Sequence, residues 1–199
     1  MTLSIENFVP KRLEATASVL ASAFVTNPLH VSAFGPAALD LNRLFFRIGV
    51  QHMFMGHTLV AIVDDEMKGF VHYAAWPQCL PPPEQLPTMV ASMFEPLGAA
   101  VPDLINWFST WSRLDPEEPH VHLGPIGVTP TAQGQGIGTA LMTRYTRYLD
   151  EQGAAGYLET DRVENVDFYK RFGFAVVHSE CVIGMPTWQM WRPVVHDTD

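Results

Sequence analysis

The sequence predicts an α/β or α+β domain built on one central sheet, and three observations support this. The chain has 199 residues, of which 47% are hydrophobic, enough for one globular domain with a sizeable core. Segments with strand and helix patterns alternate along the chain. Residues 120–151 read as a strand, a glycine-rich turn and a helix, a layout that binds phosphate groups. We therefore expect residues 1–199 to form a single domain.

The first half of the chain predicts two helices followed by an antiparallel hairpin. A turn-rich stretch with Pro28, Gly35 and Pro36 separates the helices, and the polar residues 64–66 separate the strands. The helices are expected at Lys11–Phe24 and Ala37–His52, and the strands at His57–Val63 and Gly69–Ala75.

The second half predicts short helices and then further alternation of strand and helix. Residues 76–119 are rich in proline but too apolar for a disordered linker, so short helices are expected around Met89–Phe94 and Leu104–Trp111. The later strands are expected at His120–Val128, Gly156–Thr160, Phe174–Ile183 and Thr187–Arg192. The later helices are expected at Gln135–Glu151 and Asn165–Arg171, with Gly153 and Gly173 as their stops.

Charge and cysteine content restrict the classes of function. A net charge of -9, from 12 basic and 21 acidic residues, argues against a nucleic-acid partner. Cys79 and Cys181 lie far apart, which predicts two reduced thiols and neither a disulfide framework nor a zinc knuckle. The chain shows neither a basic leader with an apolar run nor 18 consecutive apolar residues, so we expect a cytoplasmic protein with no membrane partner.

The strongest motif is Gln-Gly-Gln-Gly-Ile-Gly at residues 133–138, between a strand and an amphipathic helix. Glycines let the backbone turn tightly, and the first N–H groups of a helix have no internal partner and carry partial positive charge. Such a turn binds an anionic pyrophosphate. A P-loop would need a lysine after the turn, and a dinucleotide fingerprint would need glycine at Thr139, so both alternatives are excluded.

Gln133, Gly136 and Gly138 match the Gln/Arg-x-x-Gly-x-Gly/Ala signature, and the chain resembles the GNAT (GCN5-related N-acetyltransferase) superfamily. The strand before the turn and the Asn165-x-x-Phe168-Tyr169 helix after it resemble family elements. Residues 186–192 resemble the closing strand of small-molecule members similar to puromycin N-acetyltransferase. The resemblance implies a mixed, mostly antiparallel sheet with helices on both faces and a splayed strand at the CoA site.

The resemblance also implies acetyl-CoA as co-substrate and names the residues that bind it. Backbone groups of Ile126, Gly127 and Val128 would pair with the pantetheine arm, and Asn165 and Phe168 would flank the CoA arm. The pyrophosphate would lie on the N–H groups of Gln133, Gly134, Gln135, Gly136, Ile137, Gly138 and Thr139.

Acyl transfer from a thioester to an amine needs a base, a stabilised oxyanion and a proton for the thiolate. His120 and His122 are two apart on a strand and point to one face. The family resemblance makes His122 the leading base, acting directly or through water; a structural, hydrogen-bonded histidine is the alternative. The pair could also bind a metal, but we identify no third ligand in the sequence and expect no metal.

Tyr169 is the expected general acid by family resemblance, with core packing as the alternative. We favour the acid because Phe168 and Phe172 already supply the apolar stripe of that helix. Glu159 is a second candidate base; the alternative is a strand glutamate that pairs with a cation or faces solvent. The oxyanion would meet a backbone N–H, such as that of Val128, with a bulge at residues 124–125 opening the strand.

We expect an N-acetyltransferase in which a small-molecule primary amine attacks acetyl-CoA directly in a ternary complex. Two alternatives remain: an enzyme acting on protein N-termini or lysines, and a non-catalytic acyl-CoA-binding regulatory domain. The apolar content is compatible with a homodimer. Aromatic residues in the middle of the chain are candidates for the acceptor pocket, namely Trp76, Phe94, Trp107, Phe108 and Trp111.

Overall fold

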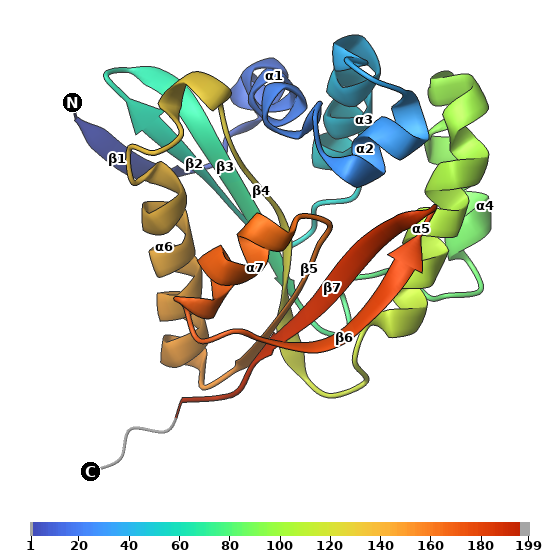
Figure 1. Ribbon diagram of the computed structural model, residues 1–199. Coiled ribbons are helices and arrows are strands. Elements are labelled where there is room, and N and C mark those ends of the chain that lie inside the picture. Colours follow the sequence, from blue (N-terminus) through green and yellow to red (C-terminus); the bar gives the residue numbers. More distant parts are fainter. Residues whose placement is uncertain (1, 196–199) are drawn as a thin grey trace.

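Seven strands form one sheet in the computed structural model, which describes residues 2–195 (Figure 1). The order is β1-β2-β3-β4-β5-β7-β6, and only the β4–β5 pair is parallel. The strands are β1 (Leu3–Asn7), β2 (His57–Val63), β3 (Glu66–Ala75), β4 (His120–Val128), β5 (Ala155–Thr160), β6 (Ala175–Val182) and β7 (Met185–Arg192). The expected mixed, mostly antiparallel sheet is confirmed.

Helices cover both faces of this sheet, as expected (Figure 1). The α-helices are α1 (Leu13–Phe24), α2 (Pro28–Phe34), α3 (Leu39–His52), α4 (Leu86–Met93), α5 (Val101–Leu114), α6 (Ile137–Gln152) and α7 (Val163–Lys170). Short 3-10 turns are found at Pro10–Arg12, Glu95–Ala100 and Pro130–Ala132.

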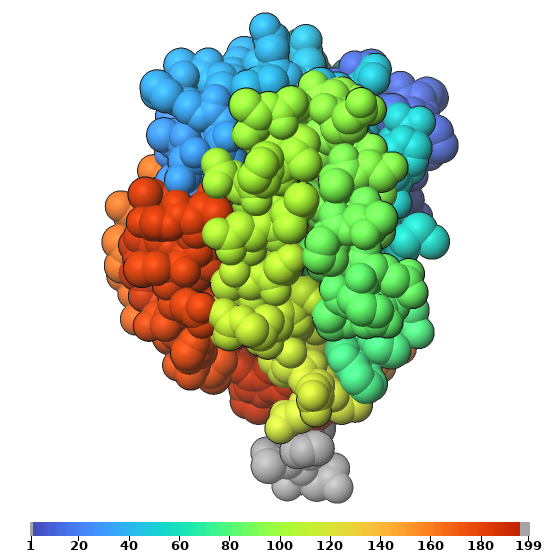
Figure 2. All heavy atoms as spheres, turned by 90° about the vertical axis from the view of Figure 1, so that its right-hand side faces the viewer, coloured from blue at the N-terminus to red at the C-terminus, as the bar shows by residue number. Residues whose placement is uncertain are grey.

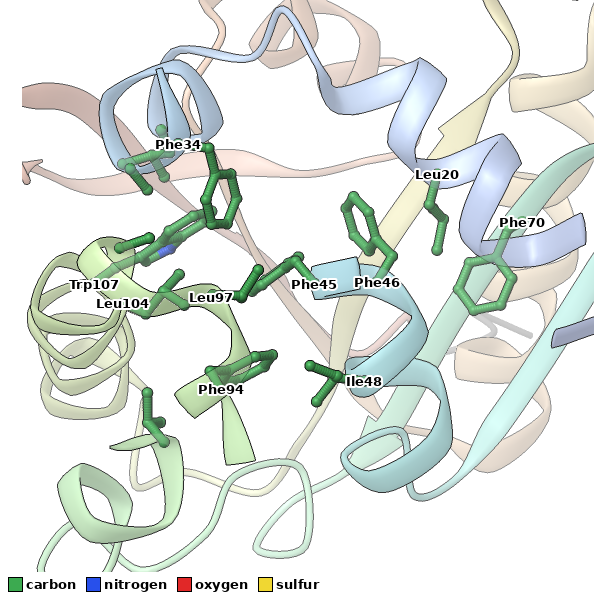
Figure 3. Close-up of a cluster of buried hydrophobic side chains, with 14 of the residues drawn as sticks. Leu20, Phe34, Phe45, Phe46, Ile48, Phe70, Phe94, Leu97, Leu104 and Trp107 are labelled. Atoms are coloured by element: carbon green, nitrogen blue, oxygen red, sulfur yellow. The ribbon is translucent and has the colours of Figure 1, made fainter. Parts of the chain in front are cut away.

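Strand β2 shows how one sequence supplies two cores. Because successive side chains of a strand point to opposite faces, Val60 and Ile62 join one hydrophobic cluster, and Leu59 and Ala61 join the other. The first cluster packs under α1–α5, and Figure 3 shows its aromatic centre. The second packs under α6 and α7. The stripe predicted for α6 is confirmed, because Ile137, Leu141, Tyr145 and Leu149 are all buried.

The sheet opens in its middle, between β4 and β5. These strands pair only over His120–His122 and Ala155–Tyr157, although each continues beyond that point. On its other edge β4 stays paired with β3, with an irregularity where Gly124 and Pro125 lie opposite His72. The splayed strand and the bulge at residues 124–125 are therefore confirmed.

Two elements differ from the sequence-based prediction. Strand β1 was not predicted, because it is an edge strand of only five residues. The stretch expected as a turn holds helix α2, since Pro28 occupies the first helical turn, where its missing N–H costs nothing, and Gly35 ends the helix with a φ of 85°. Both residues mark the ends of a helix.

Of the predicted domain 1–199, residue 1 and residues 196–199 lie outside the described part. Within residues 2–195, no single helix is long and apolar enough to cross a membrane. By length and composition alone, Pro10–Phe24 and Pro28–Phe34 taken together would pass that test, but the axes of the two segments are bent by 103° at the break between them.

Candidate active site

The glycine turn forms the N-terminal end of α6. Gly134 and Gly136 have φ angles of 77° and 83°, which L side chains rarely adopt, and open space surrounds the position of a Cβ at both. The first helical bond runs from Ala140 N–H to Gly136 C=O, so the N–H groups before it have no helical acceptor. This exposed cradle of backbone donors fits a pyrophosphate, as the sequence predicts.

The open edge of β4 supplies further backbone groups. Thr129 N–H donates to Lys68 C=O on the β3 side, 2.9 Å away. The N–H and C=O groups of successive strand residues point to opposite edges of the strand. The backbone groups of Gly127, like those of Thr129, therefore point toward β3, and the backbone groups of Ile126 and Val128 point toward the opening beside β5. The carbonyl of Val128 accepts a hydrogen bond from Gln133 Nε2 at 3.1 Å, while its N–H is directed into the opening.

A cavity of about 510 Å³ begins at this opening. Of the residues expected to bind the donor, those that line it are Ile126, Gly127, Val128, Gln133 and Asn165. The turn residues 134–139 and Phe168 do not line it, although Phe168 lies 3.7 Å from where Gly138 would carry a Cβ. The cavity is therefore continuous with the end of the proposed pantetheine path.

Aromatic side chains form the far wall of the cavity. Of those expected there, Trp107, Phe108 and Trp111 on α5 line it. Phe94 is buried in the first core and Trp76 is exposed, and neither lines it. Instead α3 and the segment after it contribute aromatic residues that we did not predict, Phe45, Phe46 and Phe54. Figure 3 shows Phe45, Phe46 and Trp107 among the side chains of this region.

His30 lies within this aromatic region and was also missed from the sequence. Its ring stacks on Phe46, with ring centroids 5.3 Å apart, and its Nδ1 lies 2.6 Å from Asn42 Oδ1. Burial lowers the pKa of His30 to about 3, so the ring is neutral at pH 7.

His122 lies between two carboxylates at the wall of the cavity. Its Nδ1 is 2.9 Å from Asp115 Oδ1, and its Nε2 is 2.8 Å from Glu159 Oε2. Burial alone would lower the pKa of His122, but Glu159 and Asp115 raise it well above 6.5. Both ring nitrogens of the residue expected to act as base are thus occupied by acceptors.

Glu159 has one free oxygen at the cavity. Its side chain is only 2% exposed, its Oε2 faces His122, and its Oε1 is buried with no hydrogen-bond partner. A buried, unpaired carboxylate oxygen is costly, so this atom is a candidate to accept a hydrogen bond from a bound molecule. Asp161, the next carboxylate lining the cavity, is already engaged by Leu29 N–H and Asn27 Nδ2.

Two further polar side chains converge on the histidine pair. Asp115, directly after α5, lies 3.5 Å from His120 Nε2, and Cys79, in the segment after β3, has its Sγ 3.8 Å from Asp115 Oδ2. Burial would lower the pKa of His120, but the nearby carboxylate of Asp115 raises it to about 9. The expectation that His120 and His122 lack further candidate ligands is wrong. Asp115 and Cys79 were missed because only the tertiary fold brings them next to the two histidines.

Tyr169 and Asn165 line the cavity from α7, as their four-residue spacing predicts. Asn165 Nδ2 donates to Thr160 Oγ1 at 3.3 Å, which anchors α7 to the end of β5. Burial raises the pKa of Tyr169, so its hydroxyl keeps its proton. The most buried side chains of α7 are Val166 and Tyr169, so the packing argument from Phe168 and Phe172 is wrong.

A family model and curated relatives both match the chain. The model of the Acetyltransferase (GNAT) family matches residues 36–174. A mycothiol acetyltransferase of Nocardia farcinica is 33% identical over 98 residues, which are 44% of this chain and 32% of that protein. A second, from Paenarthrobacter aurescens, is 32% identical over 37% of this chain and 25% of its own length. The chain thus spans about a third or less of these curated relatives.

Solved structures share the whole fold. An acetyltransferase from Corynebacterium glutamicum, described as related to a histone acetyltransferase, aligns over 100% of both chains with a TM-score of 0.74 and 20% identity. A polyamine N-acetyltransferase from Drosophila melanogaster aligns over 96% of this chain and 98% of its own, with a TM-score of 0.67 and 12% identity. At these identities the likeness shows the fold.

Proposed function

Because the chain belongs to the Acetyltransferase (GNAT) family, we propose that it transfers the acetyl group of acetyl-CoA to a primary amine of a small molecule. The observation that carries the proposal is one cavity with two ends. The backbone edge of β4 opens into it, aromatic residues form its far wall, and Glu159, whose Oε1 has no hydrogen-bond partner, also lines it. Donor and acceptor would meet there in a ternary complex.

The donor end fits acetyl-CoA through backbone groups. Acetyl-CoA, when bound, supplies the activated thioester. The N–H groups of residues 133–139 would hold its pyrophosphate, the open edge at Ile126 and Val128 would pair with its amide-containing arm, and Phe168 and Asn165 would lie beside it. The N–H of Val128 is the candidate donor for the oxyanion, since it points into the opening.

Glu159 is the residue that we assign to contact the amine. An alkylamine with a pKa near 10 is charged at pH 7, and removing its proton costs roughly 4 kcal/mol without a base. Glu159 Oε1 is free to accept that proton, whereas both nitrogens of His122 already face carboxylates. His122 then positions Glu159 through its Nε2, a change from the sequence-based preference for His122 as the base.

Tyr169 is the proposed general acid. It lines the same cavity from the opposite side of the opening, on α7, and its raised pKa keeps the hydroxyl protonated until a thiolate forms. In contact with the departing thiolate, the hydroxyl would donate a hydrogen bond that stabilises the negative charge developing on sulfur, with the proton moving toward the sulfur as the C–S bond breaks. The same residue therefore lowers the barrier to CoA release.

The acceptor end favours a compact amine with an apolar or cationic body. Trp107, Phe108 and Trp111 offer aromatic faces, which bind both hydrocarbon and cations. The whole cavity, donor end included, has a volume of about 510 Å³, which suits a small molecule better than a folded protein segment. Proteins of the same fold include a polyamine N-acetyltransferase and an agmatine N-acetyltransferase, so amines of this type define the first acceptors to test.

The test is acetyl-CoA binding by calorimetry, followed by thiol release from the same preparation with agmatine, spermidine, an arylalkylamine and a lysine peptide. We expect saturable binding and release that depends on a small amine. Preference for the peptide would favour a protein acetyltransferase. Binding without release across the panel would favour a regulatory domain, and no binding would contradict the proposal.

A further inference from the structure

Four potential metal ligands meet beside the acceptor end of the cavity. Cys79 comes from the segment after β3, Asp115 follows α5, and His120 and His122 are on β4. One ligand atom from each lies within 4.8 Å of the other three. Thiolate, imidazole and carboxylate are the ligand types that zinc takes in proteins.

The outer nitrogen of each histidine is already fixed. His120 Nδ1 is 2.7 Å from the backbone carbonyl of Glu118, and His122 Nε2 is 2.8 Å from Glu159 Oε2. A carbonyl and a carboxylate only accept hydrogen bonds, so these nitrogens carry the protons. In neutral rings the lone pairs then lie on the two inner nitrogens, the arrangement of metal-binding histidines.

The inner nitrogen of His120 has no hydrogen-bond partner. The side chain is 0% exposed, its Nε2 is buried and unpaired, and the nearest polar atom, Asp115 Oδ1, is 3.5 Å away. At that separation the carboxylate does not satisfy the nitrogen, and a buried polar atom without a partner is costly. A positive ion among the four residues would satisfy both atoms.

We propose that Cys79 Sγ, a carboxylate oxygen of Asp115, His120 Nε2 and His122 Nδ1 bind one Zn²⁺. Tetrahedral zinc with bonds of about 2.0–2.3 Å needs ligand atoms roughly 3.3–3.8 Å apart. Asp115 Oδ1 lies 2.9 Å from His122 Nδ1 and 3.5 Å from His120 Nε2, and Asp115 Oδ2 lies 3.8 Å from Cys79 Sγ. Because all four ligand atoms lie within 4.8 Å of one another, shifts of about 1 Å would complete the site. This replaces the expectation that the protein binds no metal.

The zinc would have a structural role, because four protein ligands leave no open coordination position. It would join the segment after β3 and the end of α5 to β4. Helix α5, which carries Trp107, Phe108 and Trp111, lies at the surface between α4 and the β6–β7 pair (Figure 2). The ion would therefore fix the aromatic wall, and through His122 it would hold Glu159 in place. The inference stands on side-chain geometry and does not require the proposed acetyl transfer.

Metal content of the full chain, purified without a histidine tag and supplied with ZnCl2 before desalting, tests this proposal. We expect about one zinc per chain by elemental analysis. Cys79→Ser should lower zinc retention at least tenfold, whereas Cys181→Ser, which changes the exposed cysteine on β6, should retain it. After exchange into Co²⁺, a thiolate-to-cobalt charge-transfer band should appear in wild type and Cys181→Ser and be absent from Cys79→Ser.

Thiol reactivity keeps the test decisive even where Cys79→Ser does not fold. In the zinc-loaded wild type, only Cys181 should react rapidly with a thiol reagent, and a chelator should expose Cys79 to the same reagent. Sub-stoichiometric zinc after loading, together with a Cys79 reactivity that the chelator leaves unchanged, would overturn the proposal. The cluster would then be a protonated histidine–carboxylate network, and acetyl-CoA binding would be unaffected by that result.

Discussion

The two ends of the central cavity are built from different parts of the chain. At the donor end, the groups that we propose to bind acetyl-CoA are backbone groups of β4 and of the turn before α6, which come from one continuous stretch, residues 126–139. At the acceptor end, side chains from α3, α5, β4 and β5 assemble across more than a hundred residues. The donor end should therefore be sensitive to changes in backbone conformation, and the acceptor end to changes in side-chain chemistry.

The largest expected effect is at the donor end. Gly136→Glu adds a charged side chain at a φ of 83° in the space assigned to pyrophosphate, and should reduce acetyl-CoA affinity at least 100-fold by calorimetry. Gly184→Glu is the matched control, since Gly184 has a φ of 80°, equally open surroundings and a place between β6 and β7. Equal acetyl-CoA affinity in the two variants would show that the turn at residues 133–138 is not part of the donor site.

At the acceptor end, Glu159→Gln should lower kcat by about 10²–10³-fold, because a proton acceptor is lost while the shape is kept. The acetyl-CoA affinity should stay within about twofold of wild type. Glu164→Gln, which changes a third carboxylate lining the cavity, should leave kcat unchanged. A wild-type rate for Glu159→Gln would exclude Glu159 as the base.

Between the two ends, Tyr169→Phe should reduce kcat by about 10–100-fold without changing Tm, because the ring stays and only the proton donor is removed. Tyr148→Phe, which changes a tyrosine of α6 that does not line the cavity, serves as the control. If both variants turn over like wild type, Tyr169 contributes packing alone.

The acceptor end should also respond to pH through His30. Its folded pKa of about 3 lies below the ordinary 6.5, so its stabilising contribution is complete above pH 6.5 and is lost as the pH falls toward 3. The free energy of unfolding should fall by up to about 1.4 kcal/mol per pH unit in that window. His30→Gln should flatten this slope in urea titrations; an unchanged slope would contradict the buried neutral ring.

The smallest expected effect concerns the indole N–H of Trp111. Its Nε1 is buried without a partner and the residue lines the cavity. An amine substrate that also carries an oxygen or another hydrogen-bond-accepting atom would therefore gain a hydrogen bond from this N–H. Trp111→Phe should raise the KM for the amine about 3–10-fold and leave the KM for acetyl-CoA unchanged. Trp76→Phe, outside the cavity, should change neither KM.

The sequence predicted the donor end of the cavity better than the acceptor end, because the donor end comes from one continuous stretch of chain. The proposed donor end depends on glycines and a helix start that are consecutive in sequence, so residues 133–138 predicted the strand–turn–helix geometry that the structure shows, and the binding of pyrophosphate there stays a prediction. Strands β4 to β7 were likewise predicted within a few residues, because their apolar runs end at glycines and polar turns. Helix α2 was missed because Pro28 and Gly35 mark helix ends as often as turns.

The acceptor end was predicted only in part, because proximity there depends on the tertiary fold. The spacing of His120 and His122 predicted a shared face, but nothing local placed Asp115 or Cys79 beside them. Glu159 was named as a candidate, yet its pairing with His122 arises only where β5 lies parallel to β4. His30 carried no signal, since its environment comes from three separate helices.

Initial rates with both acetyl-CoA and the best amine varied test the central claim most directly, because the account places both substrates in one cavity at the same time. Intersecting double-reciprocal lines, with no acetyl group detected on the protein by mass spectrometry, are the predicted result. Parallel lines with a stable acetyl group on a side chain such as Cys79 would contradict direct transfer from donor to amine.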